Sequence, residues 1–461
     1  MLKLFSKKFL ERLFKVLLID FLKVLCSRYY FYDFLIYLFI VKVKMTNTQK
    51  KTKKHSKKHS KILLKKTKKQ SDIDIIEKYS NKYFKKNLNK NNKTLENIIF
   101  NNQYKHLFFY GDMSLEEIKP IIDELLSFSI NDKDQNNNKQ LKGIVLHIHC
   151  GGGDTNAGLT LYNICKNVNY PLFLYTEGQS GSASTYLSFW FKDFRIIAPY
   201  STTFIHQMND NEKGQSDELY FKHDILEKMN EMFCKNYSKY SYLSENEIKE
   251  IITYDFFMSS KECLNLGLID MILPINNKNN NKNKNNNKTY ENDKHLFVLS
   301  ASQWKEYLDS KEIITHIYDC IFNNINPIIH ISDFNQGLYG VKEITMVLPL
   351  INLCSTSPIK ITAIINAPIN ESSVLFTICC SYRKMSKNSM FIINFTNIIG
   401  EDWQPKMQSR IKYYKTYSKI ISDIFNKFSQ LPRNILDNIM TERFLLSPDE
   451  CLKYKLVDEL F

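Results

Sequence analysis

The sequence predicts an α/β fold in which helices pack on a mainly parallel sheet. Within residues 141–207, three apolar runs alternate with turns of glycine and other small residues and with helical patterns. The apolar runs are Gly143 to His149, Pro171 to Tyr175 and Phe194 to Ala198. Strand, turn, helix and strand in this order build a βαβ layer. The turns that follow the strands are therefore where we expect the chemistry.

Elements on either side of this segment extend the same pattern. The run from His106 to Tyr110 predicts a short strand. Apolar residues at helical spacing from Leu115 to Phe128 predict a helix after that strand. A second, longer helix is expected after Gly214, through Leu219 to Phe233.

The chain has 461 residues and a formal net charge of +15, which is concentrated near the N-terminus. Residues 1–70 hold 20 Lys or Arg and 3 Asp or Glu, so the rest holds 43 and 45 and is close to neutral. The basic character therefore belongs to a leader and not to a nucleic-acid-binding face. We expect residues 1–90 to be a low-complexity targeting leader for an organelle, a plastid or apicoplast rather than a mitochondrion. A disordered tail, with translation starting at Met45, is the alternative.

Ten cysteines are scattered along the chain without CxxC pairs. This usage predicts reduced, buried thiols and not a disulfide framework or a zinc site. His147, His149 and Cys150 lie together on one predicted strand, but no distant Cys or His pair completes a metal site. We therefore expect neither a metal nor a cofactor.

A linker and a repeat divide the chain. The tract NNKNNNKNKNNNK within residues 276–293 has no apolar side chain to bury and predicts a flexible linker. Residues 431–458 align without gaps to residues 243–270, at an offset of 188. A repeat of this length predicts two whole domains, at residues 91–275 and 294–461.

Four motifs follow one another along the first of these domains. They are Gly152-Gly153 with Ala157-Gly158, Gly178-Gln179-Ser180-Gly181-Ser182, Ile205-His206-Gln207, and a segment from Tyr254 to Asp270 that contains Asp255. In this order they resemble the Clp protease proteolytic subunit (ClpP) family of serine peptidases. The resemblance implies the α/β ClpP/crotonase-like fold, a repeated ββα-type spiral, and the repeat predicts two such domains in tandem, of which the second is degenerate.

The resemblance implies a catalytic triad of Ser182, His206 and Asp255 in the first domain. His206 would take the proton of Ser182, because a serine hydroxyl is a poor nucleophile without an adjacent base. Asp255 would hold the imidazole and stabilise its protonated form. These roles imply a serine endopeptidase.

The turns around the nucleophile would supply the oxyanion hole. The amides of Gly153 and Ala183 are the expected donors to the oxygen of the tetrahedral intermediate. Gly152, Gly178 and Gln179 are expected to support these turns, since small residues let the backbone approach a substrate closely.

The second domain lacks these groups. At the offset of 188, the three triad positions hold Asn370, Asn394 and Arg443. Ser372 and Ser373 are near the first of them, but no histidine follows at the right distance. The second domain is therefore expected to be catalytically inactive.

The resemblance also implies partners. ClpP relatives assemble with other ClpP-like or ClpR-like subunits into heptameric double rings, and the long helix after Gly214 corresponds to the handle through which two rings meet. A separate AAA+ Clp chaperone would deliver unfolded polypeptides, because the chain has no Walker motif. No nucleic acid partner is expected.

Three other functions remain open. A non-catalytic ring subunit of the ClpR type would have the same fold and no reactive serine. A crotonase-type acyl-CoA enzyme would use amide donors from similar turns, but it gives no reason for Ser, His and Asp to coincide. A Ser/Lys enzyme would need a lysine near the nucleophile, and Lys192 lies too far along the predicted helix.

Overall fold

The computed structural model describes residues 98–130, 141–191, 194–208, 216–253, 255–276, 293–298, 307–332, 341–395 and 407–461. All of them lie in one compact unit, Ser71–Phe461. The predicted leader, Lys192 and nearly all of the predicted linker (residues 277–292) lie outside the described residues. Within these ranges no helix has both the length and the apolar character needed to cross a membrane.

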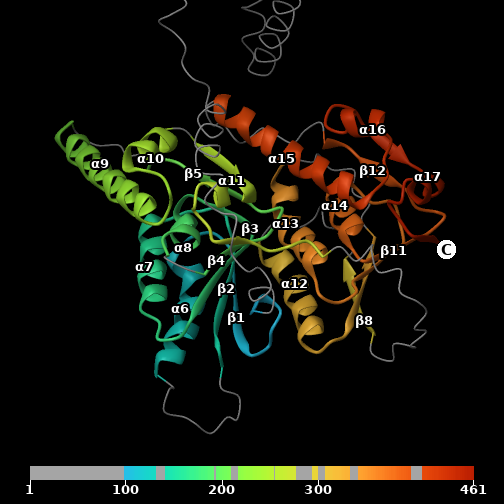
Figure 1. Cartoon of the computed structure of the whole chain (residues 1–461), viewed down its shortest axis with the longest axis horizontal. Helices are drawn as coiled ribbons and strands as arrows, with labels where there is room; N and C mark the ends of the chain where they lie inside the picture. The colour runs from blue at the N-terminus through green and yellow to red at the C-terminus, as the bar shows by residue number, and fades with distance from the viewer. Residues whose placement is uncertain are drawn as a thin grey trace, which may run out of the picture. The chain divides into compact units, whose positions relative to one another are not determined.

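The N-terminal half, residues 98–276, is built on a sheet of seven strands (Figure 1). Its main path is parallel throughout and runs β1 (Tyr104–Tyr110), β2 (Gly143–Cys150), β3 (Leu172–Gly181), β4 (Arg195–Ile197) and β7 (Met271–Ile272). Off this path, the end of β3 pairs in parallel with β5 (Thr202–Ile205), which pairs antiparallel with β6 (Phe256–Ser259). The predicted parallel α/β sheet is therefore present, with one antiparallel pair added at its carboxyl end.

Helices of the N-terminal half pack on one face of this sheet. They are α6 (Leu115–Ile130), α7 (Thr155–Lys166), α8 (Thr185–Phe189), α9 (Ser216–Lys239), α10 (Glu245–Ile252) and α11 (Ser260–Asn265). Leu107, Leu146 and Leu174 lie side by side on neighbouring strands and belong to the core beneath these helices. Alternate residues of a strand point to opposite faces, so the other face needs a separate cover.

One predicted boundary was wrong. Gly178 to Gly181 was expected to be a turn, but β3 continues through these residues to Gly181. The extension follows from pairing with β5, which places Gln179 beside Thr202 and Gly181 beside Phe204. The small residues stay extended because a neighbouring strand satisfies their backbone groups, and the turn begins only at Ser182.

The C-terminal half, residues 293–461, has a sheet of five parallel strands. In spatial order they are β8 (Asp293–Val298), β9 (Asn326–Ile331), β10 (Thr362–Ile365), β11 (Tyr382–Met385) and β14 (Glu459–Leu460). A separate antiparallel pair consists of β12 (Phe391–Ile393) and β13 (Phe444–Leu446). The helices are α12 (Tyr307–Phe322), α13 (Val341–Thr356), α14 (Glu371–Cys379), α15 (Met407–Phe428), α16 (Arg433–Asn438) and α17 (Pro448–Lys453).

Each half contains a buried arginine on the fourth strand of its main path. Arg195 bonds both carboxylate oxygens of Asp270, at 2.9 and 3.1 Å, and donates to two backbone carbonyls. Arg383 bonds Asp458 in the same way, at 3.0 Å to each oxygen, and also donates to two carbonyls. A buried arginine is stable only when its donors are paired. The two Arg–Asp pairs, here called clamps, therefore fix corresponding strand ends.

Two helices of the C-terminal half cover the second face of the N-terminal sheet. In Figure 1, α12 and α13 lie beside β1 to β3, on the side opposite α6 and α7. The Asn352 side chain donates to the Glu177 carbonyl at 2.7 Å and accepts from the Tyr200 amide at 2.8 Å. Tyr318 packs its ring against Phe108. The two halves therefore share one continuous buried junction.

Candidate active site

Ser182 stands where β3 ends, as the first residue of a short 3-10 turn, Ser182–Ser184. Its φ is +50°, a left-handed conformation that costs a non-glycine residue on the order of 1–3 kcal/mol. The turn is held by Ser184, whose Oγ accepts from the Gly181 amide and lies 2.8 Å from the Cys150 carbonyl oxygen. This bonding keeps the Ser182 side chain, which is half-exposed, projecting from a rigid support.

His206 follows directly after β5 and faces this serine. Its Nε2 lies 2.8 Å from Ser182 Oγ, within hydrogen-bonding distance. The next amide, that of Gln207, donates to the Ile252 carbonyl at 2.8 Å and so fixes the backbone. The imidazole also stacks on Phe204, whose ring occupies the space that a side chain at position 181 would need. The predicted pair of nucleophile and base is therefore brought together in the structure.

The environment of His206 favours the neutral imidazole. Partial burial lowers its pKa below the ordinary value, while the charge of Asp255 and a hydrogen bond with the Gln207 backbone raise it by less. A neutral imidazole at pH 7 is the form that can accept a proton from a hydroxyl. Asp255 precedes β6 and acts on His206 through its charge.

Replacing Asp255 by asparagine is expected to shift the acid limb of the pH–rate profile to lower pH. The carboxylate raises the pKa of His206, so removing it leaves the imidazole neutral at more acidic pH. We expect a plateau rate about 10- to 10²-fold lower, less than the loss for an aspartate that holds the imidazole directly. The readout is the rate at which a fluorophosphonate labels the protein as a function of pH, with Glu245→Gln as the control. An unchanged limb, or a shift to higher pH, would contradict the assignment.

The turn from β2 to α7 packs against Ser182. Gly152 and Gly153 have φ values of +116° and +140°, which only glycine adopts without strain. The Met113 amide donates to the Gly152 carbonyl at 2.8 Å, and the Asp154 amide donates to the Met113 carbonyl at 2.6 Å. Neither of these two bonds uses the Gly153 amide, and Gly153 lies at an exposed position.

The remaining predicted site residues occupy supporting positions. Ala183 is fully buried and directly follows Ser182, so its amide lies in the turn itself. Gly178 and Gln179 lie within β3, where the Gln179 amide donates to His149 Nδ1 at 2.9 Å. A side chain at position 178 would come within 2.4 Å of that nitrogen. Both residues therefore act by packing, some distance along the strand from Ser182.

Two supporting residues were not predicted from the sequence. Ser184 holds the turn at Ser182, but a serine in a run of small residues gave no separate signal. Thr185 Oγ1 lies 2.5 Å from the Ser182 carbonyl oxygen and 2.6 Å from the Tyr237 hydroxyl. Tyr237 is 52 residues further along the chain on α9, so only the folded structure reveals this contact.

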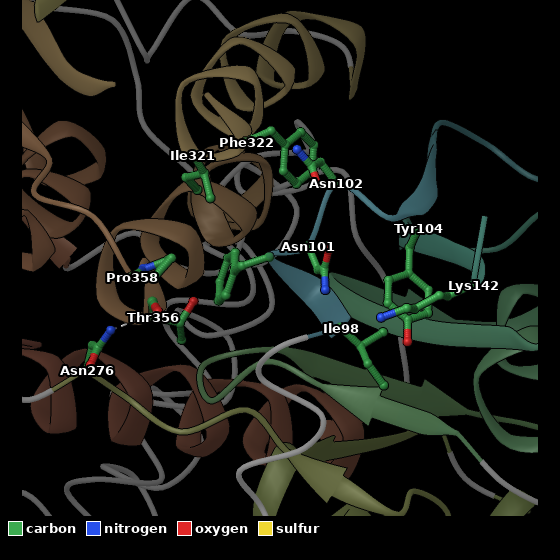
Figure 2. Close-up of a pocket in the computed structure, with 11 residues that line it drawn as sticks. Ile98, Asn101, Asn102, Tyr104, Lys142, Asn276, Ile321, Phe322, Thr356 and Pro358 are labelled. Carbon is green, nitrogen blue, oxygen red and sulfur yellow. Dashed lines mark hydrogen bonds between the residues drawn. The ribbon is translucent and has the colours of Figure 1, made fainter. Parts of the chain in front are cut away.

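A cavity of about 640 Å³ lies at the junction of the two halves, away from this site (Figure 2). The residues that line it come from both halves: Ile98, Phe100, Asn101, Asn102, Tyr104, Lys142 and Asn276 from the N-terminal half, and Ile321, Phe322, Thr356 and Pro358 from the C-terminal half. None of the predicted site residues lines it. We assign it no part in the chemistry of Ser182.

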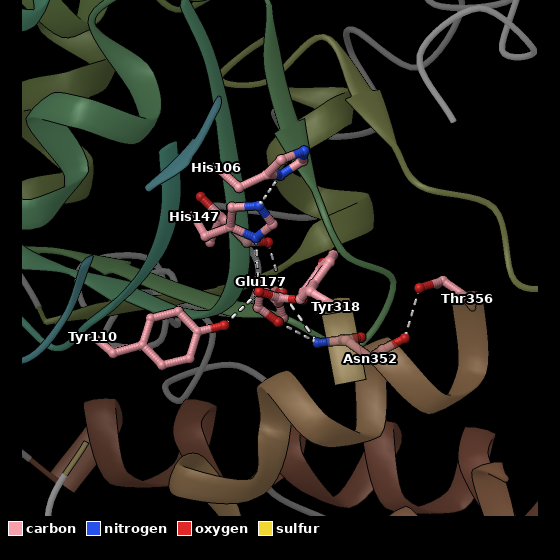
Figure 3. A network of polar contacts seen from close by, with 9 residues as sticks. His106, Tyr110, His147, Glu177, Tyr318, Asn352 and Thr356 are labelled. Carbon is pink, nitrogen blue, oxygen red and sulfur yellow. Dashed lines mark hydrogen bonds and ion pairs between the residues drawn. The ribbon is translucent and has the colours of Figure 1, made fainter. Parts of the chain in front are cut away.

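A buried polar cluster is centred on Glu177 of β3 (Figure 3). Glu177 on β3 accepts hydrogen bonds from Tyr110 and from Tyr318, and one of its oxygens lies 3.0 Å from His147 Nδ1. His147 Nε2 in turn lies 2.9 Å from His106 Nδ1. A buried carboxylate is costly unless it is hydrogen-bonded, and here donors from both halves satisfy it.

The histidines of β2 are therefore engaged in protein contacts. Burial lowers the pKa of His149 to about 3 and raises that of Cys150 to about 12, so both stay uncharged at neutral pH. Among the described residues, no group of three His, Cys, Asp or Glu side chains is placed to hold a metal ion. The nine cysteines in the described ranges are all free and buried.

Comparison with known proteins points to one family. Residues 87–276 match the family model described as Clp protease. An ATP-dependent Clp protease proteolytic subunit from Deinococcus radiodurans is 28% identical over 131 residues, 28% of this chain and 64% of the relative. The ATP-dependent Clp protease proteolytic subunit 2 from Prochlorococcus marinus is 28% identical over 134 residues, 29% of this chain and 67% of the relative.

These matches cover part of each protein. The chain spans a little less than two thirds of the first relative's length, and the family match falls in the half of the chain that holds Ser182 and His206. The mixed α/β architecture with a largely parallel sheet fits that family. Residues 87–276 are thus similar to the Clp protease family, and the relatives support a Clp-type proteolytic subunit.

Proposed function

We propose that the protein is a serine endopeptidase subunit of a Clp-type proteolytic complex. The observation that carries this proposal is the 2.8 Å contact between His206 Nε2 and Ser182 Oγ. The serine is half-exposed and stands on a strained turn. It adjoins a double-glycine turn in which Gly153 is exposed. These are the parts that acyl transfer requires.

The proposed reaction proceeds in two steps. Ser182 Oγ attacks the peptide carbonyl carbon while His206 Nε2 takes the hydroxyl proton, and the amides of Gly153 and Ala183 stabilise the oxyanion. His206 then gives the proton to the leaving amine, which leaves an ester on Ser182. A water molecule, deprotonated by His206, attacks that ester, and His206 returns the proton to Ser182 Oγ as the ester bond breaks and the carboxylic acid product leaves.

Labelling with a fluorophosphonate probe tests this proposal. The wild-type chain should be labelled at Ser182, Ser182→Ala should not be labelled, and Ser241→Ala should be labelled like the wild type. A wild-type chain that stays unlabelled, alone and with a Clp chaperone, would favour the alternative of a non-catalytic subunit of the ClpR type. Tight binding of an acyl-CoA would instead favour a crotonase-type enzyme.

We propose further that the C-terminal half is a second, inactive Clp-like domain. Its five parallel strands have the same spatial order as the main path of the first sheet, and Arg383 repeats the clamp of Arg195. Asn370, at the position of the nucleophile, is buried and caps α14 by accepting from the Ser373 amide. Complete loss of labelling in Ser182→Ala, which retains Ser372 and Ser373, would support this assignment.

The cellular setting is also a proposal. Unfolded polypeptides would be delivered by a separate AAA+ Clp chaperone, and ClpP-like or ClpR-like subunits would complete a double ring. The basic residues 1–90 would direct the chain to an organelle, a plastid or apicoplast. A fluorescent protein fused behind these residues that remains in the cytosol would reject that part.

A further inference from the structure

Two paired strands of the N-terminal sheet carry the base of the candidate site. His206 directly follows β5, and Asp255 directly precedes β6. The strands pair antiparallel, with Ile205 beside Phe256, so both groups lie at the same end of the β5–β6 pair. The position of this pair of strands therefore sets where the imidazole lies relative to Ser182.

An aromatic stack leads from His206 to the C-terminal half of the chain. The imidazole stacks on Phe204 at a ring-centre distance of 5.9 Å, and Phe204 stacks on Phe257 at 4.9 Å. Phe257 in turn meets the ring of Tyr413 edge-on, at 4.7 Å. Aromatic pairs at such distances attract each other beyond the effect of the area that they bury. Because Tyr413 lies on α15, the last ring of this stack belongs to the C-terminal half.

The same helix also holds the far end of the β5–β6 pair. The Tyr417 hydroxyl lies 3.1 Å from Thr202 Oγ1, and the Lys412 ammonium lies 2.5 Å from one Glu262 oxygen. The other Glu262 oxygen accepts from the amide and the hydroxyl of Ser259, the last residue of β6. Burial alone would raise the pKa of Glu262, but Lys412 and the Ser259 bonds lower it below its ordinary value. Breaking a buried charged pair of this kind is costly, so α15 is fixed on β6.

The ring that supports the imidazole is itself held by its neighbours. Phe204 is half-exposed, and its ring fills the space beside Gly181, where no side chain would fit. Phe257 and Tyr413, the next two rings of the stack, are buried, with 2% and 4% of their surface exposed. A catalytic group keeps its geometry to within about 0.5 Å only when packing locks the side chains around it. The outermost of these supports comes from the C-terminal half.

We propose that Tyr413 is a positioning residue that holds His206 in place through this aromatic stack. The C-terminal half thereby takes part in the reaction at Ser182, although its own triad positions hold other residues. The inference rests on the proposed serine peptidase function. Ser182 itself is held separately, by the bonds of Ser184. Loss of Tyr413 therefore displaces the base and leaves the nucleophile in place.

Tyr413→Ala is expected to slow fluorophosphonate labelling of the full chain by about 10- to 10²-fold. A displacement of about 1 Å at a reacting group costs about 10²-fold, and a shift passed on through two rings is smaller. Tyr413→Phe keeps the ring and should label like the wild type. Tyr414→Ala is the matched control, because this half-exposed neighbour on α15 points about 100° away from Tyr413 around the helix. It should also label like the wild type.

The pH dependence of labelling separates a displaced base from a loss of folded protein. Burial lowers the pKa of His206, and the charge of Asp255 and the Gln207 backbone raise it by less. An imidazole that has lost its aromatic cover is closer to water, so its pKa rises. The acid limb of the labelling rate should therefore shift to higher pH in Tyr413→Ala. A smaller folded fraction would lower the rate without moving the limb.

A double variant shows whether the effect passes through the stack. Phe204→Ala removes the ring that contacts the imidazole and should slow labelling at least as much as Tyr413→Ala. The combination of both changes should be no slower than Phe204→Ala alone, because residues that act through one contact are not additive. If the alanine variant at position 413 does not fold, Tyr413→Leu keeps apolar volume, removes the ring and should show the same loss and the same shift.

Two results would overturn the inference and leave the proposed function standing. One is a labelled wild type whose rate and acid limb are both unchanged in Tyr413→Ala. The other is a loss in Tyr413→Ala that remains in full beside Phe204→Ala, since the effect would then bypass the stack. A wild-type chain that is not labelled at all would reject the proposed function, and this inference with it.

Discussion

Replacing His206 by alanine is expected to slow hydrolysis of a short fluorogenic peptide by about 10⁶-fold. Nucleophile and base act as one unit in serine peptidases, so loss of either removes nearly all of the rate that the pair provides. Here the base is within 2.8 Å of Ser182 Oγ, and burial lowers its pKa so that it is neutral at pH 7. No other histidine in the described residues contacts Ser182.

The double variant gives a sharper form of this prediction. Ser182→Ala combined with His206→Ala should be about as slow as either change alone, because the two losses are not additive. His223→Ala is the control, since that histidine lies exposed on α9 beside Glu227. A loss below about tenfold in His206→Ala would mean that another group takes the proton, and the proposed pair would be rejected.

Replacing Gly152 by alanine is expected to lower the rate of Ser182 labelling by about 10³-fold or more. A methyl group at this position would lie 2.6 Å from Ser182 Cβ and 2.8 Å from the Gly181 carbonyl oxygen. The φ of +116° also disfavours any side chain. A displacement of about 1 Å at the nucleophile costs about 10²-fold, and loss of one oxyanion donor about 10²–10³-fold.

Gly111→Ala is the matched control for this substitution. A methyl group there meets only the flexible end of the Glu117 side chain, at 3.0 Å, which can move aside. We expect labelling within about twofold of the wild type. If Gly152→Ala is folded and labels at the wild-type rate, the double-glycine turn does not shape the site.

The sequence predicted the elements of the N-terminal half well, because apolar runs and helical spacing mark buried strands and amphipathic helices. Strand β3 shows where such reasoning stops. Gly178 to Gly181 have the composition of a turn, and only their pairing with β5 keeps them extended. Strand β5 in turn pairs with β6, which lies more than 70 residues further along the chain.

In the candidate site too, local motifs predicted some residues and could not predict others. The motifs identified Ser182 and His206, because each motif is local and has a fixed spacing. Asn352, which binds the Glu177 carbonyl across the junction, lies 175 residues from its partner. Its position in an apolar helix gave no sign of that contact. Long-range polar contacts of this kind depend on how the halves pack, which no local pattern encodes.

The junction between α13 and β3 also bears on how many places a ring of such chains could have. Under the proposed pair of Clp-like halves, a chain joined through this junction would fill two neighbouring places in the proposed ring. A ring made only of such chains has an even number of places, whatever its diameter. A seven-membered ring would therefore need an odd number of single-domain subunits beside it, so the covalent link would make this protein dependent on a shorter relative for closure.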